Sequence, residues 1–547
     1  MRKTILILIT LFICVYGFAQ DYTIQDRLEY DVQLDSLVVE TFNTLEDAQQ
    51  YIEENTIPSD TYVFDKYEWS IKEGVITDEE ALVNREQIND AVTYAHNNGF
   101  TVFEVNDLDA YFEVRAGFGG SKVENYRRSI QLPSNFHLKM NENTFIRVQP
   151  NDKRDYALLC AFSEINVTVS GGHLVGDRYT HDYDGGDTGV QDLGYGLYFI
   201  GVVNGVVEGI SADKFTGDGF IISSPIKRND DGSENQSSHY GEVYFSKNLI
   251  VRNSTFDDNR RNGLALTDVE GALLENLTFT KTGLGVRGKG EPYGWQGVIP
   301  RHAIDLEAIQ YFNDDGITLK LNEIVDDVII RNSVFQNNYG DIDFYKASNV
   351  DVYGNTFTAG SGGVGAFNVK VHNNTFIADA TAKDRGLNVK PLVRSDGSHF
   401  VKNWEIYDNV ISGYKTAIQI GGENQRVENN IISDFKTGIF LLTGKNVLVK
   451  GNDLKSDVKN VKGIYNYPRG IDAINYTIIN NEFDLTGLYG YGFDFKKTKG
   501  NNFVLDNCTF TQRVRISNSE NITIKNSIFP SSNFNKENIN ITLENNN

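Results

Sequence analysis

The sequence has little of what marks several common classes of protein. It holds 3 cysteines in 547 residues, and only Cys160 and Cys508 lie beyond the first twenty residues. Because these two are far apart in the sequence, a disulfide is not implied, and two thiols buried in a core are the simpler interpretation. After the amino terminus no run of about 18 apolar residues occurs, so we predict no membrane insertion.

Positive charge is also scarce. The chain carries 51 Lys and Arg residues against 74 Asp and Glu residues, a formal net charge of −23 at pH 7. This balance argues against nucleic acid and anionic membranes as partners, because an acidic surface repels both. A polyanion that binds this chain must therefore meet a local basic patch.

The first twenty residues, MRKTILILITLFICVYGFAQ, contain the one long apolar run. Arg2 and Lys3 precede an apolar stretch that extends through Val15, and small residues surround a cleavage position near Ala19. This pattern is typical of a secretory signal peptide, here residues 1–19. It predicts a soluble mature protein that is secreted or periplasmic, with both compartments left open.

The second half of the chain repeats a pattern about every 22 residues. Each unit has short stretches rich in Val, Ile, Phe and Thr that surround an Asn, as in RNSTF (252–256) and RNSVF (331–335). This period indicates a solenoid, and the lack of 3.6-residue periodicity excludes helical repeats. We predict an all-β fold, a right-handed parallel β-helix, whose Asn residues adopt left-handed backbone or stack along the axis. The repeated residues are Asn253, Asn276, Asn332, Asn355, Asn374, Asn409, Asn430, Asn452, Asn481, Asn507 and Asn526.

The residues before the repeats fit a cap. In VNREQINDAVTYAHNNG, residues 83–99, four apolar side chains share one helical face: Ile88, Ala91, Val92 and Ala95. We predict a capping helix over 83–98, because the open end of a solenoid exposes unpaired strands. The acidic residues 20–82 are predicted to form a small amino-terminal appendage, and residues 83–547 the β-helix domain.

These features together resemble the pectate-lyase-like superfamily of carbohydrate-active β-helices. The resemblance rests on the capping helix, on LPSNFHLKM and INVTVSGGHLVGDR, and on the repeated Asn-x-x-Phe coils, and it covers about residues 84–547. It implies a polysaccharide lyase, glycoside hydrolase, epimerase or glycan-binding protein. The signal segment ending in FAQ is similar to those of Bacteroidetes, many of which digest algal polysaccharides.

The chain departs from the best-known members of that superfamily at their reactive signatures. It lacks the Gly-His-Gly of polygalacturonases, the Asp-Pro-His of alginate epimerases and the Arg-x-Pro-x-x-Arg of pectate lyases. The catalytic residues of those families are therefore not carried over, and candidates must come from the pattern of this chain.

Aligning the strands that follow successive turns gathers polar side chains on one exterior sheet. In the shared register every inward position is apolar, Asp305 lies beside Asp343 at a backbone spacing of about 4.8 Å, and Glu307 lies beside Tyr345. Like charges stacked in this way are destabilising, so function is expected there. The aligned stretches are 217–223, 261–267, 301–307 and 340–345.

The candidate site residues fall into two groups. The candidate catalytic residues are Arg301, His302, Asp305, Glu307, Asp343 and Tyr345. The candidate substrate-binding residues are Arg261, Lys346 and three members of the Gly-rich insertion 283–300, namely Arg287, Tyr293 and Trp295. Aromatic rings can stack on sugars, and cations can hold carboxylate or sulfate groups. A second polar stretch with His372 and Lys390 is predicted to be ordinary surface, and NDDG (313–316) a turn.

Two reactions would use the cluster differently. In β-elimination on a uronic acid, a base removes the C5 proton, a cation neutralises the carboxylate and an acid assists the leaving oxygen. His302 and Tyr345 are the candidate base and acid, and Arg301, Arg261 or Lys346 the neutralising cation. A sugar leaving group makes the enzyme a lyase, and water at a chain end makes it a dehydratase.

Hydrolysis would instead use two carboxylates. Asp305 with Asp343 suits the roughly 5 Å separation of a retaining pair, and Asp305 with Glu307 is nearer the roughly 6.5–9.5 Å of an inverting pair. Because Arg, His, Tyr and Lys crowd the carboxylates, we favour elimination on an acidic algal polysaccharide, with or without sulfate groups. Hydrolysis ranks second, and a non-catalytic glycan-binding solenoid third. The metal is left unknown, with Ca²⁺ as a bridge to a substrate carboxylate the one cofactor considered. The oligomeric state stays open.

Overall fold

The computed structural model forms two compact units, an amino-terminal unit of Met1–Thr255 with Val269–Leu274 and a carboxy-terminal unit of Phe256–Asp268 with Glu275–Asn547. The structure describes residues 22–26, 30–34, 37–42, 60–115, 129–184, 191–228, 234–239, 245–285, 296–308, 310–312, 319–321, 323–380, 382, 384–392, 400–467, 473–496, 499–530, 532–534 and 539–546.

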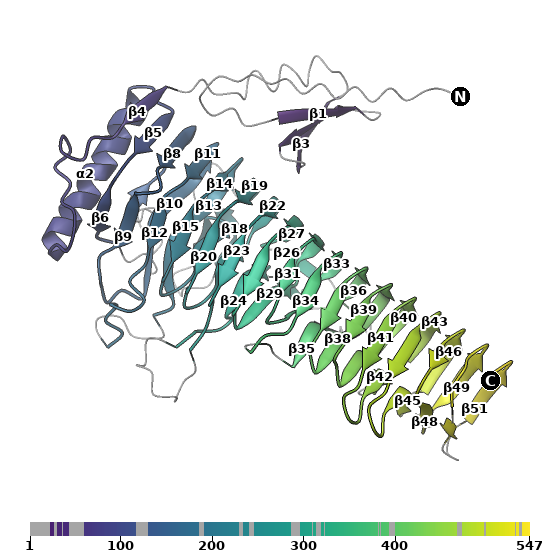
Figure 1. The fold of residues 1–547 in the computed structure, drawn as a ribbon. Helices are drawn as coiled ribbons and strands as arrows, with labels where there is room; N and C mark the ends of the chain where they lie inside the picture. Colours follow the sequence, from purple (N-terminus) through teal and green to yellow (C-terminus); the bar gives the residue numbers. More distant parts are fainter. Residues whose placement is uncertain are drawn as a thin grey trace. The chain divides into compact units, whose positions relative to one another are not determined.

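The carboxy-terminal unit is a parallel β-helix, as predicted, in which each coil adds one strand to each of three ladders (Figure 1). The first ladder, which carries the candidate site, contains β21 Leu264–Leu266, β24 His302–Glu307, β29 Gly340–Tyr345, β32 Ser361–Val364, β35 Arg385–Lys390, β38 Thr416–Glu428, β40 Thr437–Lys450, β42 Lys462–Asn466, β45 Tyr491–Lys496, β48 Arg513–Ser517 and β50 Ser532–Phe534.

Two further ladders complete each coil. The second contains β27 Val325–Arg331, β30 Ser348–Tyr353, β33 Phe367–His372, β36 Lys402–Tyr407, the long strands β38 and β40, β43 Ala473–Ile479, β46 Lys499–Asp506, β49 Glu520–Lys525 and β51 Ile539–Glu544. The third contains β23 Thr278–Thr280, β28 Val334–Gln336, β31 Thr356–Phe357, β34 Thr375–Ile377, β37 Val410–Ser412, β39 Ile431–Ser433, β41 Asp453–Ser456, β44 Glu482–Leu485 and β47 Thr509–Phe510.

The amino-terminal unit repeats this construction. Its ladders are β5 Val102–Val105, β8 Phe136–Met140, β11 Val167–Ser170, β14 Val206–Glu208, β19 Ser246–Arg252 and β22 Val269–Glu275; β7 Ile130–Gln131, β10 Asp155–Ile165, β13 Leu193–Val203 and β16 Phe220–Ser223; and β6 Asp109–Phe112, β9 Phe145–Val148, β12 His173–Val175 and β15 Ser211–Asp213. Residues predicted as an appendage take part, because β4 Thr61–Val63 pairs in parallel with β5. The preceding strands β1 Tyr22–Asp26, β2 Tyr30–Leu34 and β3 Leu37–Phe42 form an antiparallel sheet.

The capping helix α2, Asp78–Asn97, begins five residues before the predicted start at 83. The Thr77 hydroxyl accepts from the Glu80 N–H at 3.3 Å, and the Glu80 carboxylate accepts from the Thr77 N–H at 2.9 Å. This capping box satisfies two helix-end donors. The signal T-x-x-E is present in the sequence, so the earlier start follows from local chemistry that the apolar face alone does not reveal.

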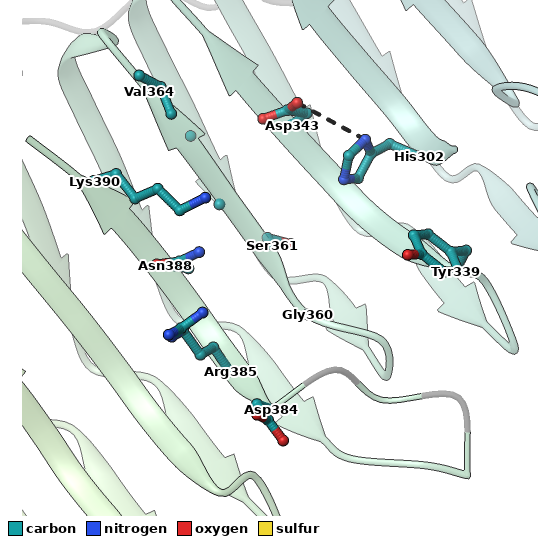
Figure 2. A pocket seen from close by; sticks show the side chains of 12 residues that line it. His302, Tyr339, Asp343, Gly360, Ser361, Val364, Asp384, Arg385, Asn388 and Lys390 are labelled. Carbon is teal, nitrogen blue, oxygen red and sulfur yellow. Dashed lines mark ion pairs between the residues drawn. The ribbon is translucent and has the colours of Figure 1, made fainter. Parts of the chain in front are cut away.

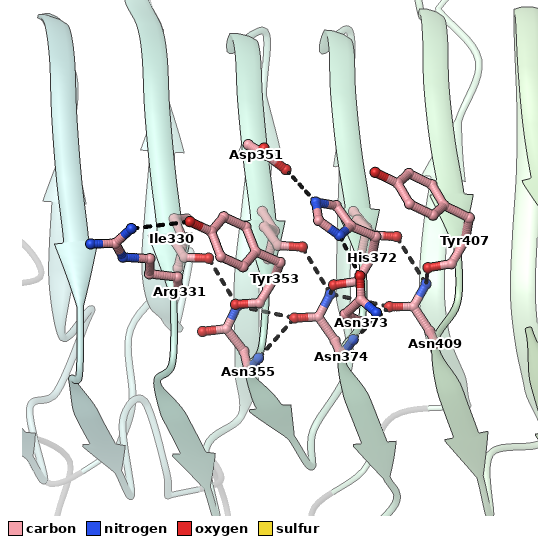
Figure 3. Close-up of polar contacts among 12 residues, drawn as sticks. Ile330, Arg331, Asp351, Tyr353, Asn355, His372, Asn373, Asn374, Tyr407 and Asn409 are labelled. Atoms are coloured by element: carbon pink, nitrogen blue, oxygen red, sulfur yellow. Dashed lines mark hydrogen bonds and ion pairs between the residues drawn. The ribbon is translucent and has the colours of Figure 1, made fainter. Parts of the chain in front are cut away.

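The repeated Asn residues divide into two neighbouring positions with different roles. One position adopts left-handed backbone, as at Asn332 (φ 53°) and Asn373 (φ 54°). The next is buried and forms an amide ladder along the axis, in which Asn355 donates to Asn374 at 3.0 Å and Asn374 to Asn409 at 3.1 Å (Figure 3). Both predicted roles of Asn are therefore confirmed, and the repeat list combines two adjacent columns.

A buried Phe follows the Asn in many of the repeats, and its place in the third ladder accounts for this second part of the motif. Five buried Phe rings lie one above another at centroid distances of 4.6–5.1 Å along the third ladder: Phe256, Phe279, Phe335, Phe357 and Phe376. Each ring fills the interior of its own coil and contacts the next, so the repeated pattern encodes the stacking of coils.

Cys160 and Cys508 are both buried free thiols, as expected. Cys508 occupies the ladder position that Asn holds in earlier coils, and its N–H donates to the Ser527 hydroxyl at 3.2 Å. Burial raises the pKa of the Cys508 thiol to about 11, which keeps it protonated at neutral pH. Among the described residues, no helix has both the length and the apolar character needed to cross a membrane.

Candidate active site

The register predicted for the polar cluster is confirmed. Across β21, β24 and β29, Ala265 is opposite Asp305, Asp305 is opposite Asp343, and Glu307 is opposite Tyr345. The side chains between them are buried and apolar: Leu264, Leu266, Ile304, Leu306, Ile342 and Phe344. The apolar set therefore fixes which side chains point away from the core.

Asp305 lies beneath the surface rather than on it, with 1% of its area exposed. The buried Asn262 connects it to the neighbouring coil, because its Nδ2 donates to Asp305 Oδ2 at 3.2 Å and its Oδ1 accepts from the His302 N–H at 3.0 Å. Asn262 therefore bonds to both Asp305 and the His302 backbone, and these two hydrogen bonds fix the start of β24.

A groove of about 400 Å³ lies on the outer face of the first ladder (Figure 2). It runs across β24, β29, β32 and β35, and is lined by His302, Tyr339, Asp343, Gly360, Ser361, Gly362, Gly363, Val364, Asp384, Arg385, Asn388 and Lys390. Of the predicted catalytic residues the groove brings together His302 and Asp343. It then extends two coils further than the predicted cluster, to β35.

His302 and Asp343 form one side of the groove. His302 Nδ1 lies 3.9 Å from Asp343 Oδ2, and the side chains are 16% and 28% exposed. This separation exceeds that of a direct hydrogen bond, so the two groups face each other across a short gap. The Tyr339 side chain, at the entry to β29, lines the same side.

Two cations from β35 form the opposite side of the groove. Arg385 and Lys390 are exposed, and within the described parts of the chain neither is paired with a carboxylate. Between them, the Asn388 amide oxygen accepts from Gln419 Nε2 at 2.6 Å, which holds the strand surface in place. Such exposed cations, in a chain of net charge −23, are positioned to bind an anion.

The floor of the groove is a glycine-rich strand that follows a turn held by a buried carboxyl group. Asp341 Oδ2 accepts from the backbone N–H groups of Thr358, Ala359 and Gly360 at 2.8–3.0 Å. Burial raises the Asp341 pKa to about 7, although these hydrogen bonds act in the opposite direction. Gly362 is opposite Asp343 on the outer face, and a Cβ there would lie 2.7 Å from the Asn388 backbone oxygen, so this floor position cannot carry a side chain without a shift of the backbone.

The predicted cations Arg301 and Arg261 have structural partners. Arg301 donates to the Gly283 and Gly285 carbonyl oxygens at 2.6 and 2.7 Å, and its guanidinium lies 3.7 Å from the centroid of the Tyr339 ring. Arg301 therefore holds the start of the Gly-rich insertion against the groove side. Arg261 lies 3.7 Å from the Glu307 carboxylate.

Tyr345 and Lys346 do not line the groove. They lie at the end of β29, where the Lys346 ammonium is 4.8 Å from the centroid of the Tyr345 ring. Arg287, Tyr293 and Trp295 lie outside the described residues, as does NDDG at 313–316. The strands that flank this last segment, β25 Gln310–Phe312 and β26 Leu319–Leu321, pair antiparallel.

The second polar stretch, predicted as ordinary surface, divides between two faces. Lys390 belongs to the groove, whereas His372 lies on the outer face of the second ladder (Figure 3). Its Nε2 is 3.0 Å from Asp351 Oδ1, its Nδ1 is 2.7 Å from Asn373 Oδ1, and its ring stacks with Tyr353 and Tyr407. The sequence alone did not place Lys390 in the groove. The strand between it and Asp343, β32, is Ser-Gly-Gly-Val and offers few apolar side chains from which to align the coils.

Metal binding has no clear site in the described part of the chain. There, no three His, Cys, Asp or Glu side chains are grouped to hold an ion. Asp305 and Asp343 are adjacent, but burial of Asp305 leaves Asp343 as the carboxylate that reaches the groove from this pair.

Comparisons with known proteins agree with the β-helix class. Residues 301–483, which include the whole groove, match the family model described as a right handed beta helix region. The chain is 26% identical over 387 residues to the uncharacterized protein YclG of Bacillus subtilis (strain 168), covering 69% of this chain and 60% of that protein. It is 24% identical over 356 residues to the SPbeta prophage-derived uncharacterized protein YorA of the same organism, covering 63% and 55%. The chain thus spans about three fifths of the length of these curated relatives.

Solved structures with a similar fold have diverse names. The mannuronan C-5 epimerase AlgE6 A-module of Azotobacter vinelandii has a TM-score of 0.42 at 15% identity, covering 84% of this chain and 99% of that one. PfbA, a surface adhesin of Streptococcus pneumoniae, has a TM-score of 0.45 at 15% identity, covering 80% and 93%. The tailspike protein of E. coli bacteriophage HK620, in complex with pentasaccharide, has a TM-score of 0.40 at 15% identity, covering 87% and 76%. At these values the likeness concerns the fold alone.

Proposed function

We propose that the protein is a secreted polysaccharide lyase that acts on a uronate-containing polysaccharide or its oligosaccharides by β-elimination. The observation that carries this proposal is the composition of the groove. It places a histidine with a carboxylate on one side and, on the other, two cations that have no carboxylate partner among the residues the structure describes. The resemblance to the pectate-lyase-like superfamily is consistent with it.

The proposed reaction assigns one role to each side of the groove. Arg385 and Lys390 bind the uronate carboxylate and stabilise the negative charge that develops when the neighbouring C5–H bond breaks. The imidazole of His302, which lies beside Asp343, accepts the C5 proton. The electron pair forms the C4–C5 double bond as the C4–O bond breaks, and Tyr339 donates a proton to the leaving oxygen. Tyr339 takes the role given from sequence to Tyr345, because it lines the groove.

Hydrolysis by a pair of carboxylates is less well supported. The pairs considered from sequence both include Asp305, which is buried and receives a hydrogen bond from Asn262. Such a residue cannot contact a glycosidic bond without a rearrangement of the coil. Asp384 also lines the groove, but its carboxylate is 3.0 Å from the Lys415 ammonium.

Product analysis tests the proposal. The purified protein is incubated with polygalacturonate, alginate and sulfated uronate-containing algal polysaccharides, while ultraviolet absorbance of the unsaturated uronyl group and product masses are followed. We expect new absorbance and cleaved products without added water. Cleavage that adds water, with no rise in absorbance, would establish hydrolysis instead. Loss of water from intact chain ends would indicate a dehydratase, and addition of a chelator tests whether Ca²⁺ takes part.

A further inference from the structure

A second group of cations lies on the outer face of the ladder that carries the groove, closer to the carboxyl terminus. The column of Asn388 continues through Gln419, Phe440, Tyr465, Asp494 and Arg515, each opposite the last on successive strands. Five strand spacings of about 4.8 Å put Arg515 roughly 24 Å along the axis from Asn388. We call this region the distal cationic patch, defined by Lys462, Tyr465, Tyr491, Lys496, Arg513 and Arg515.

The distal cationic patch has more positive charge than its carboxylate can neutralise. Asp494 is fully buried and lies 3.2 Å from the Lys462 ammonium and 2.6 Å from the Arg515 guanidinium. Among the described residues, no carboxylate pairs with Lys496 or Arg513. Two of the four cations of the patch therefore share one carboxylate, in a chain whose net charge is −23.

Three of the four cations of the patch lie against aromatic rings. The Lys462 ammonium lies 3.5 Å from the centroid of the Tyr465 ring, and the guanidinium groups of Arg515 and Arg513 lie 3.9 and 4.8 Å from that of Tyr491. The Tyr491 hydroxyl accepts from Arg515 at 2.9 Å. Burial lowers the Lys462 pKa, and repulsion from Lys496 and Arg515 adds to this effect. A bound anion would relieve that repulsion.

We propose that the distal cationic patch is an accessory site for an anionic polysaccharide, which binds the chain whose reacting unit occupies the groove. This inference rests on the proposed function for the identity of that chain. An extended polyanion is the occupant that fits, because the groove and the patch lie on the same ladder, five strand spacings of about 4.8 Å apart. The tyrosine hydroxyls and ring edges add contacts to sugar hydroxyls and faces.

Binding of long and short probes distinguishes the patch from the groove. The test variant is Lys496→Gln with Arg513→Gln, because these half-exposed cations can change without uncovering the buried Asp494. The matched control is Lys370→Gln with Lys450→Gln, two exposed lysines on the second ladder. All variants carry His302→Ala to prevent turnover, and binding to polygalacturonate, alginate and their uronate trimers is measured by calorimetry and affinity electrophoresis.

We expect the test variant to bind polymer at least fivefold more weakly and to bind polymer and trimer with similar affinity. The polymer affinity of the control variant should change less than twofold. Equal weakening of polymer and trimer, unchanged polymer binding, or absence of polymer binding by the wild-type chain would each overturn the accessory site. If polymer binding falls as expected but wild-type protein yields no unsaturated product, the patch stands and the proposed elimination fails.

Discussion

Two outer faces of the carboxy-terminal unit carry similar polar side chains but satisfy them differently. On the second ladder, His372 has a partner at each ring nitrogen and a tyrosine on each ring face. On the first ladder, His302 lies 3.9 Å from Asp343 at the side of a groove. A histidine in a stack of coils is thus a poor sign of chemistry by itself, and its partners and access decide its role.

The arginines of the two faces show the same contrast. Arg331 donates to Glu275 at 2.7 Å and to the Tyr353 hydroxyl at 3.2 Å, so its charge is used within the fold. Arg385 has no carboxylate partner in the described residues and lies in the groove with Lys390. Polar groups that satisfy one another stabilise coils, whereas cations left unneutralised beside a cavity are available to a ligand.

The sharpest test of the comparison exchanges one histidine on each face for alanine. His302→Ala should lower kcat by about 10²–10⁴-fold, the range for loss of a general base, with little change in stability. His372→Ala should leave kcat within twofold and lower the free energy of unfolding by about 1–2 kcal/mol, because stacking and hydrogen bonds are lost. Steady-state kinetics and urea unfolding measure both, and equal effects of the two variants on kcat would remove the distinction.

Titration of Asp341, beneath the groove floor, should make the free energy of unfolding depend on pH. We expect no such contribution from Asp351 on the outer face of the second ladder. The Asp341 pKa is raised from 3.8 to about 7, so its contribution to stability is fully present below pH 3.8 and is lost as pH rises through 7. The difference corresponds to roughly 4 kcal/mol at most, at about 1.36 kcal/mol per pKa unit.

Urea unfolding from pH 4 to pH 8 measures that slope. Asp341→Asn should flatten it, because the variant group does not titrate. Asp351→Asn, on the second ladder, serves as the control that retains it. A wild-type slope in Asp341→Asn would mean that another group titrates over this range.

A smaller effect is expected for the cations. Single replacements Arg385→Ala and Lys390→Ala should each lower kcat/KM on uronate substrates by roughly 10- to 100-fold, because a charge-assisted hydrogen bond contributes about 1.5–3 kcal/mol. Arg331→Ala should lower stability and spare kcat/KM. If Arg385→Ala acts equally on a neutral, carboxyl-reduced substrate, the cation does not recognise the uronate.

Much of the fold could be predicted because its causes are local and repeated. Asn followed two or three residues later by a buried apolar residue, most often Phe, recurs along the solenoid, so one turn and one buried position were enough to identify the repeat. The strand register followed from apolar residues such as Ile304 and Leu306, and it placed Asp305 beside Asp343. The helix start at Asp78 was missed because the capping box lies outside the apolar face.

The candidate site was harder to predict because a strand register says which residues are neighbours and not which are accessible. Asp305 and Asp343 are equivalent in the column, yet one is buried and the other reaches the groove. Arg385 was missed because a Gly-rich coil separates it from the polar cluster. Arg301 was placed near the site, but its hydrogen bonds to carbonyl groups depend on a turn that no spacing reveals.

Stacking one coil per repeat has a consequence for how such a protein changes over time. The interval between the groove and the distal cationic patch is a whole number of coils, so duplication or deletion of one repeat would alter it by a fixed step of about 4.8 Å. Such a change leaves the residues of the groove and of the distal cationic patch as they are. In the enzyme proposed above, the distance between the groove and the distal cationic patch can therefore change without any change in the residues proposed to react.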